Sequence, residues 1–172
     1  MTDASQQSPD LGSPRTRLSA MVTAMLSALG RLCGWLLIFI IFVQFGIVIA
    51  RYLFALNYLW LQELALYGHA ALFMLGAAWT LLQDRHVRID VLSERWGHAR
   101  RRKVDQVGTV VLLIPLMLAI GISSYPYVVQ SWSVLERSAE ISGLPGLFIV
   151  KSLIPAFAAL MVLAGLLRLA RR

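Results

Sequence analysis

The sequence predicts an all-α membrane protein, a bundle of four transmembrane helices with both termini in the cytoplasm. Three observations lead to this prediction: long uncharged stretches, an apolar composition and an uneven distribution of basic residues. The chain has 172 residues, of which 58% are hydrophobic and only 15% are charged, and its mean hydropathy is +0.69. About 20 consecutive apolar residues are enough to cross the roughly 30 Å hydrocarbon core of a bilayer. This composition therefore favours a membrane protein over a soluble domain of the same length.

Four uncharged stretches are long enough to contain transmembrane helices. They lie within residues 32–50, 64–83, 106–135 and 141–167, the last interrupted only by Lys151. From the edges of these stretches we expect spans at about 33–53, 60–82, 106–128 and 144–167.

The basic residues predict how these spans are oriented. Of the 16 Lys and Arg residues, all but Arg51, Arg137 and Lys151 lie before the first span, in the loop of residues 83–103, or after the last span. Loops rich in Lys and Arg resist translocation and stay on the cytoplasmic side. We therefore expect this loop and both termini to be cytoplasmic.

Two segments outside the spans raise alternatives. Residues 1–17 are rich in Ser, Pro, Gln and Asp and are expected to form a disordered cytoplasmic tail, which leaves residues 18–172 as a single membrane domain. Apolar residues recur at helical spacing within 18–29, which predicts either an interfacial amphipathic helix or a cytoplasmic extension of the first span. The Val91–Lys103 segment is a second candidate for a helix that lies along the membrane surface.

Ionisable residues at membrane depth are the first functional candidates, because hydrocarbon solvates them poorly. Glu63 opens the second span near Trp60, where water still reaches the carboxylate, so a structural or docking role is expected. His69 lies about two turns into the same span and is expected to hydrogen-bond to another helix. The remaining histidines lie in the basic loop and cannot supply a second axial ligand for a haem between spans.

Lys151 lies one or two turns inside the fourth span. Its long side chain can snorkel to the membrane surface, or its ammonium can pair with a carboxylate from the same side of the membrane. The candidates are Glu63, Glu136 and Glu140, and the sequence does not distinguish among them.

No constellation of catalytic residues can be assembled from this sequence. It offers no nucleophile–base pair, metal cluster, phosphate-binding loop or paired carboxylates at the middle of a span, and its single cysteine, Cys33, excludes a disulfide framework. We therefore expect neither an enzyme nor a cofactor, and no partner made of nucleic acid. A chain with so little polar interior is better explained as a subunit of a larger complex. Two alternatives stay open: a haem- or quinone-associated respiratory membrane anchor that depends on His69, and a self-contained small multidrug-type exporter that depends on Glu63.

The stretch WLQELALYGHAALFMLGAAWTLLQDRHVRIDVL, residues 60–92, carries the motifs of a known membrane protein family. A Trp and a Glu open the second span, a Leu-Gly-Ala-Ala patch follows, and a basic residue, a His and an Asp come after the span; these are Trp60, Glu63, Leu75, Gly76, Ala77, Ala78, Arg85, His86 and Asp90. The segment SWSVLERSAEISGLPGLFIVKSLIP, residues 131–155, is similar to the third loop and fourth span of one subgroup. From its first span to its C-terminal tail, the chain resembles the DctQ-type small permease subunit of TRAP transporters.

The resemblance implies a function in transport. Members of this family are small integral-membrane subunits of sodium-coupled importers of organic acids in the bacterial inner membrane. They work with a large permease subunit, which carries the substrate and sodium sites, and with a periplasmic substrate-binding protein that delivers the carboxylate. The small subunit is expected to support the large subunit and to help the binding protein dock, so the transport chemistry would belong to a partner.

The resemblance also implies roles for three groups of residues. Helix packing against the large subunit is expected of Gly76, Ala77 and Ala78. A polar cluster in the cytoplasmic loop, in contact with membrane phospholipids, is expected of Arg85, His86, Arg88 and Asp90, with a solvated topogenic loop as the alternative. Docking of the binding protein or periplasmic ion pairing is expected of Trp60, Glu63, Glu136, Arg137, Glu140 and Lys151, with simply solvated charges as the alternative.

Overall fold

The computed structural model describes residues 14–83, 98–140 and 142–170 of the chain. This part of the chain is built from helices, which are α1 (Pro14–Phe54), α2 (Leu59–Leu82), α4 (His98–Gly108), the π-helix η1 (Thr109–Leu113), α5 (Ile114–Ser133) and α6 (Leu147–Ala170). No β-strand occurs among these residues, although one isolated bridge joins Arg137 to Pro145. The all-α prediction is confirmed.

Four helices are long and apolar enough to cross a membrane, and they match the predicted spans except that the fourth begins at Leu147 rather than at about residue 144. They are Ser19–Phe54, Leu59–Leu82, Arg102–Ser133 and Leu147–Ala170. Only 17% of the residues in the most apolar part of each helix are buried within the chain. Most of the apolar surface is therefore left for lipid or for another membrane protein, as is expected of helices in a bilayer.

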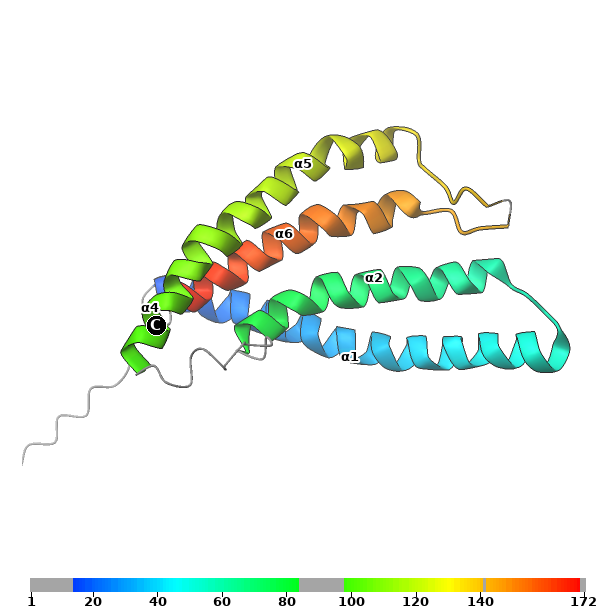
Figure 1. The fold of residues 1–172 in the computed structure, drawn as a ribbon, viewed down its shortest axis with the longest axis horizontal. Helices are drawn as coiled ribbons and strands as arrows, with labels where there is room; N and C mark the ends of the chain where they lie inside the picture. Colours follow the sequence, from blue (N-terminus) through cyan, green and yellow to red (C-terminus); the bar gives the residue numbers. More distant parts are fainter. Residues whose placement is uncertain (1–13, 84–97, 141, 171–172) are drawn as a thin grey trace, which may run out of the picture.

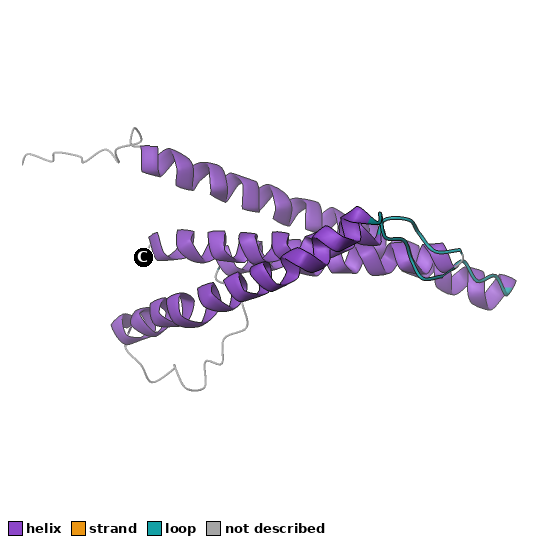
Figure 2. Ribbon diagram, turned by 90° about the horizontal axis from the view of Figure 1, so that it is seen from above, coloured by secondary structure: helices purple, strands orange, loops and turns teal. Residues whose placement is uncertain are grey.

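The four long helices lie side by side in the order α1, α2, α6 and α5 (Figure 1). Helices α2 and α6 occupy the middle, and α1 and α5 flank them. The start of α1, the end of α2 and the end of α6 lie at one end of the molecule, where α1 and α5 splay apart (Figure 2). The α1–α2 and α5–α6 connections lie together at the opposite end, which we call the hairpin end.

The core lies along α6, because this helix packs against both α2 and α5. Its buried members are Leu26, Ala78, Leu81, Met117, Ala158, Met161, Ala164 and Leu167. Half of them belong to α6, and three of the eight are alanines. Small side chains let helix backbones approach closely, which is how membrane helices pack when water does not drive their association.

Helix α1 is a single helix of 41 residues. Residues 18–29 therefore extend the first span without a break, which agrees with the second of the two alternatives for this segment. The helix begins at Pro14, inside the segment expected to be a disordered tail, and proline is well suited to a first helical position. Residues 1–13 of that tail lie outside the described residues.

Helix α4 continues through η1 into α5 without a break in the helical backbone. The predicted surface helix Val91–Lys103 is described only from His98 onward, and there it is the beginning of the third long helix. Its earlier part lies within residues 84–97, outside the described residues. Arg168 near the end of α6 holds α4 in place, since its guanidinium donates to Asp105 Oδ2 at 3.2 Å.

Candidate functional site

The α5–α6 loop at the hairpin end is fastened to the start of α2 by Glu63. Glu63 Oε1 accepts a hydrogen bond from the Ser138 hydroxyl, and Oε2 accepts one from the Leu144 backbone N–H at 2.6 Å. Both donors belong to the loop, far along the chain from α2. Hydrogen bonds to an ionised carboxylate are stronger than those between neutral groups. We call these three residues the Glu63 latch.

Gly143 makes the latch sterically possible. A Cβ atom at this position would lie 2.8 Å from Glu63 Oε2 and would also collide with the Ser138 side chain. The loop closes on itself here, because the Gly143 N–H donates to Glu140 O at 3.0 Å and the Glu140 N–H donates to Ser138 Oγ at 3.2 Å. The loop's own hydrogen bonds therefore help to place its two donors next to the Glu63 carboxylate.

Lys151 and Glu136 form a second tie, between the first turns of α6 and the beginning of the α5–α6 loop. Lys151 Nζ lies 2.5 Å from Glu136 Oε2 and 4.0 Å above the centre of the Tyr127 ring. The hydrogen bond from Lys151 lowers the pKa of the Glu136 carboxyl from its ordinary value. Of the three partners that the sequence left open for Lys151, the structure selects Glu136.

A third tie joins α5 to α6 and was not foreseen. Trp132 Nε1 donates to Ser152 Oγ at 2.7 Å, and the indole meets the Phe148 ring edge-to-face with centroids 4.7 Å apart. No local pattern marks Ser152 as the partner of Trp132, because the two residues meet only after the helices pack.

The six predicted periplasmic residues thus divide into two sets. Glu63, Glu136 and Lys151 turn toward the chain and hold the loop. The other three face outward: Trp60 is 44% exposed and packs edge-to-face on Tyr58, and Arg137 and Glu140 are exposed on the loop itself. The first set stabilises the conformation of the α5–α6 loop, and the second set is exposed at the surface of the hairpin end.

The small-residue patch of α2 serves mainly the packing of the chain itself. Ala78 is fully buried in the core described above, and Gly76 lies against α1, where a Cβ would be 3.7 Å from Cys33 Sγ. Gly76 and Ala77 also line an open apolar groove of about 450 Å³ between α1 and α2. Of the three predicted contacts with another subunit, only Gly76 and Ala77 are accessible.

The predicted loop cluster lies outside the described residues. Its members, all within residues 84–97, are Arg85, His86, Arg88 and Asp90. Their assignment to a cytoplasmic polar cluster stays a prediction.

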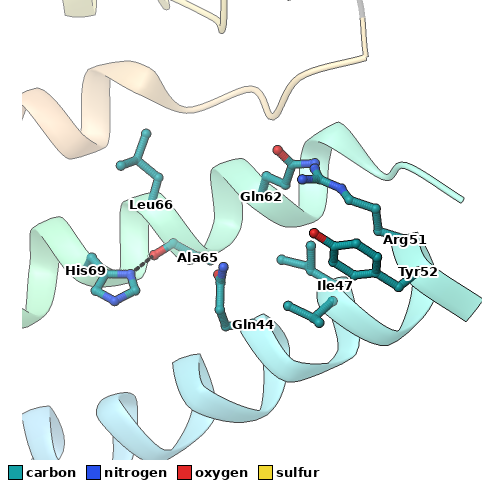
Figure 3. A pocket seen from close by; sticks show the side chains of 9 residues that line it. Gln44, Ile47, Arg51, Tyr52, Gln62, Ala65, Leu66 and His69 are labelled. Atoms are coloured by element: carbon teal, nitrogen blue, oxygen red, sulfur yellow. Dashed lines mark hydrogen bonds between the residues drawn. The ribbon is translucent and has the colours of Figure 1, made fainter. Parts of the chain in front are cut away.

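Among the described residues, His69 does not make the expected hydrogen bond to another helix. Its Nδ1 lies 2.8 Å from the Ala65 carbonyl oxygen, one turn earlier on α2 (Figure 3). The ring lines a cleft of about 360 Å³ between α1 and α2 together with Gln44, Arg51 and Gln62. We call this hollow the α1–α2 cleft. No group of three or more potential metal-ligating side chains occurs in the described part of the chain.

The fold and these contacts define a multi-pass membrane protein whose polar residues at the hairpin end hold a loop in place. The family described as "Tripartite ATP-independent periplasmic transporters, DctQ component" matches residues 37–172. The chain therefore belongs to this family and is a small membrane component of a TRAP transporter, which works with other TRAP subunits. No curated protein and no solved structure matches the chain.

Proposed function

We propose that this chain is the small permease subunit of a sodium-coupled importer of organic acids in the bacterial inner membrane. The observation that carries the proposal is the DctQ match, which covers residues 37–172 and so includes α2, α5, α6 and the hairpin end of α1. In this role the chain supports a large permease subunit, which moves the substrate, and contributes a docking surface for a periplasmic substrate-binding protein.

The distribution of basic residues supports the orientation required for this role. Among the described residues, the hairpin end carries only Arg51, Arg137 and Lys151. In the sequence, the other 13 of the 16 Lys and Arg residues come before the first predicted span, within residues 83–103 or after the last predicted span. Because Lys- and Arg-rich segments stay in the cytoplasm, the hairpin end is periplasmic and both termini are cytoplasmic in this proposal. Residues 18–172 then act as one membrane domain behind a short cytoplasmic tail.

The fastened α5–α6 loop supports a part in docking. The Glu63 latch and the Lys151–Glu136 pair hold the loop before any partner arrives, so little conformational freedom is lost when a partner binds it. The exposed side chains Trp60, Arg137 and Glu140 are the proposed contacts, and Glu63, Glu136 and Lys151 keep them in position. We expect exposed charges of this kind to affect chiefly the rate of encounter with a soluble protein.

Contacts within the membrane complete the proposal. Gly76 and Ala77 face an accessible groove, which supports helix packing with the large subunit. Arg85, His86, Arg88 and Asp90 are assigned to a cytoplasmic loop cluster that contacts phospholipid phosphates, because juxtamembrane basic residues are attracted to anionic headgroups.

Affinity purification tests this proposal first. The chain, tagged on its N-terminal tail, is recovered from native membranes in mild detergent, and its companions are identified by mass spectrometry. We expect a much larger polytopic protein in a fixed ratio to this chain. Recovery of the chain alone, or with haem or a soluble redox subunit, would overturn the proposal. Uptake by proteoliposomes that contain the pair and the binding protein, with and without a sodium gradient, then tests the coupling and the class of substrate.

A further inference from the structure

The α1–α2 cleft brings together polar side chains that the loop contacts do not use. Gln44 on α1 points toward α2, and His69 on α2 points toward α1 (Figure 3). Arg51, Tyr52 and Gln62 line the same cleft nearer the hairpin end. The site contains one cation and several hydrogen-bonding groups, and its other walls are aliphatic.

The cleft runs from the membrane surface into the hydrocarbon. Arg31 and Arg51 enclose an uncharged stretch of α1 that is about 30 Å long at 1.5 Å per residue, which matches the thickness of the hydrocarbon core. Gln44 comes seven residues before Arg51, so it lies roughly 10 Å inside this core. His69 follows Glu63 by six residues and so lies roughly 9 Å deeper along α2 than Glu63.

The described residues do not satisfy the deep groups of the cleft. The Gln44 side chain is exposed, and none of the hydrogen bonds among the described residues involves its amide. His69 Nδ1 faces a carbonyl oxygen, which can only accept, so Nδ1 carries the hydrogen and Nε2 is left as an acceptor. Polar groups that face lipid tails are unfavourable, because the tails cannot hydrogen-bond.

Arg51 is available at the mouth of the cleft. One of its nitrogens donates to Asn57 Oδ1 at 3.2 Å, and Gln62 Nε2 donates to the same oxygen at 2.5 Å. A guanidinium has five N–H donors, so a carboxylate or a phosphate could still bind there. A phospholipid could place its phosphate on Arg51, but its acyl chains would then lie against Gln44 and His69 and leave both unsatisfied.

We propose that the α1–α2 cleft docks a transmembrane helix of another subunit that carries two polar side chains. One is acidic and lies opposite Arg51. The other is a hydroxyl or amide about two turns deeper, where it donates to His69 Nε2 and bonds the Gln44 amide. This inference rests on the proposed function, since the larger membrane subunit of the transporter would supply the helix.

Photo-crosslinking tests the occupant directly. A photoreactive amino acid at position 44 is activated in native membranes, and the adducts of the full-length chain are identified by mass spectrometry. The inference predicts an adduct with a transmembrane segment of the larger subunit. Adducts with phospholipid alone would overturn it.

Substitutions test the hydrogen bonds. We expect Gln44→Leu and His69→Leu each to reduce the larger subunit retained in mild detergent roughly threefold, and the double variant roughly tenfold, since interhelical hydrogen bonds in membranes are individually modest. Gln130→Leu makes the same change at an exposed position on α5 and is expected to leave retention unchanged. Unchanged retention in the double variant would overturn the inference.

These outcomes separate the two proposals. If the wild-type chain is recovered without any larger polytopic partner, the proposed function fails and this inference fails with it. If the partner is recovered but position 44 crosslinks only to lipid, the proposed function survives and the assignment of the cleft is wrong.

Discussion

The two helical hairpins of this molecule use their polar residues in opposite ways. In the α5–α6 hairpin, Lys151 binds Glu136 and Trp132 binds Ser152, so these four side chains satisfy one another. In the α1–α2 hairpin, Gln44 is exposed and, within the described part of the chain, His69 bonds only to its own helix. A hairpin whose polar side chains bond one another is stabilised without a partner. A hairpin with unsatisfied polar side chains is expected to bind another helix that supplies their hydrogen bonds.

The Glu63 latch connects the two hairpins, and its loss is the largest effect we expect. In Glu63→Ala, the Ser138 hydroxyl and the Leu144 N–H lose a shared carboxylate, which should lower the free energy of unfolding by about 3 kcal/mol. Thermal unfolding of the purified chain in detergent measures this. Glu140→Ala removes an exposed carboxylate from the same loop and should change stability by less than about 0.5 kcal/mol. Equal effects of the two substitutions would show that the latch does not hold the loop.

The packing of α1 against α2 should be sensitive to a side chain at Gly30 and insensitive to one at Gly34, one turn later. A Cβ at Gly30 would lie 2.5 Å from the Trp79 ring, whereas a Cβ at Gly34 would meet no other atom within 4 Å. Overpacking should make Gly30→Val destabilising by about 2 kcal/mol, with Gly34→Val close to wild type. Thermal unfolding of both variants checks this, and similar values for the two would contradict the close approach at Gly30.

A smaller effect is expected where α5 meets α6. Trp132→Phe keeps an aromatic ring against Phe148 but removes the hydrogen bond to Ser152, which should lower stability by about 1 kcal/mol. Trp60→Phe is the matched control, because this indole is similarly exposed and packs only at the edge of Tyr58. If both substitutions have the same effect, the Ser152 contact contributes nothing measurable.

The smallest expected effect is a dependence on pH. Lys151 lowers the pKa of the Glu136 carboxyl, so the folded state favours its ionised form. The stabilisation is complete above the ordinary glutamate pKa of about 4.3 and is lost as the pH falls through the lowered value. The thermal midpoint should therefore fall more steeply with acidification in wild type than in Glu136→Gln between about pH 6 and pH 3. Parallel curves would refute the contribution of this pair.

The spans were predictable because hydrophobicity is a local property of the chain. Uncharged stretches locate all four helices, and the motif from Trp60 to Asp90 identifies the family that the match over residues 37–172 confirms. The prediction that His69 bonds to another helix was wrong, and the reason is physical. A histidine in a helix can bond the carbonyl four residues earlier, and the sequence does not reveal whether a neighbouring helix offers a better acceptor.

The four apolar helices, the segments rich in basic residues and the transporter family can all be read from the sequence. These properties depend on composition and spacing along the chain. The three-dimensional structure was needed to find that Glu63 holds the α5–α6 loop, that Lys151 pairs with Glu136, and that α6 lies between α2 and α5. Such contacts join residues far apart in the chain, such as Glu63 and Leu144, and packing geometry selects them among several chemically equal partners.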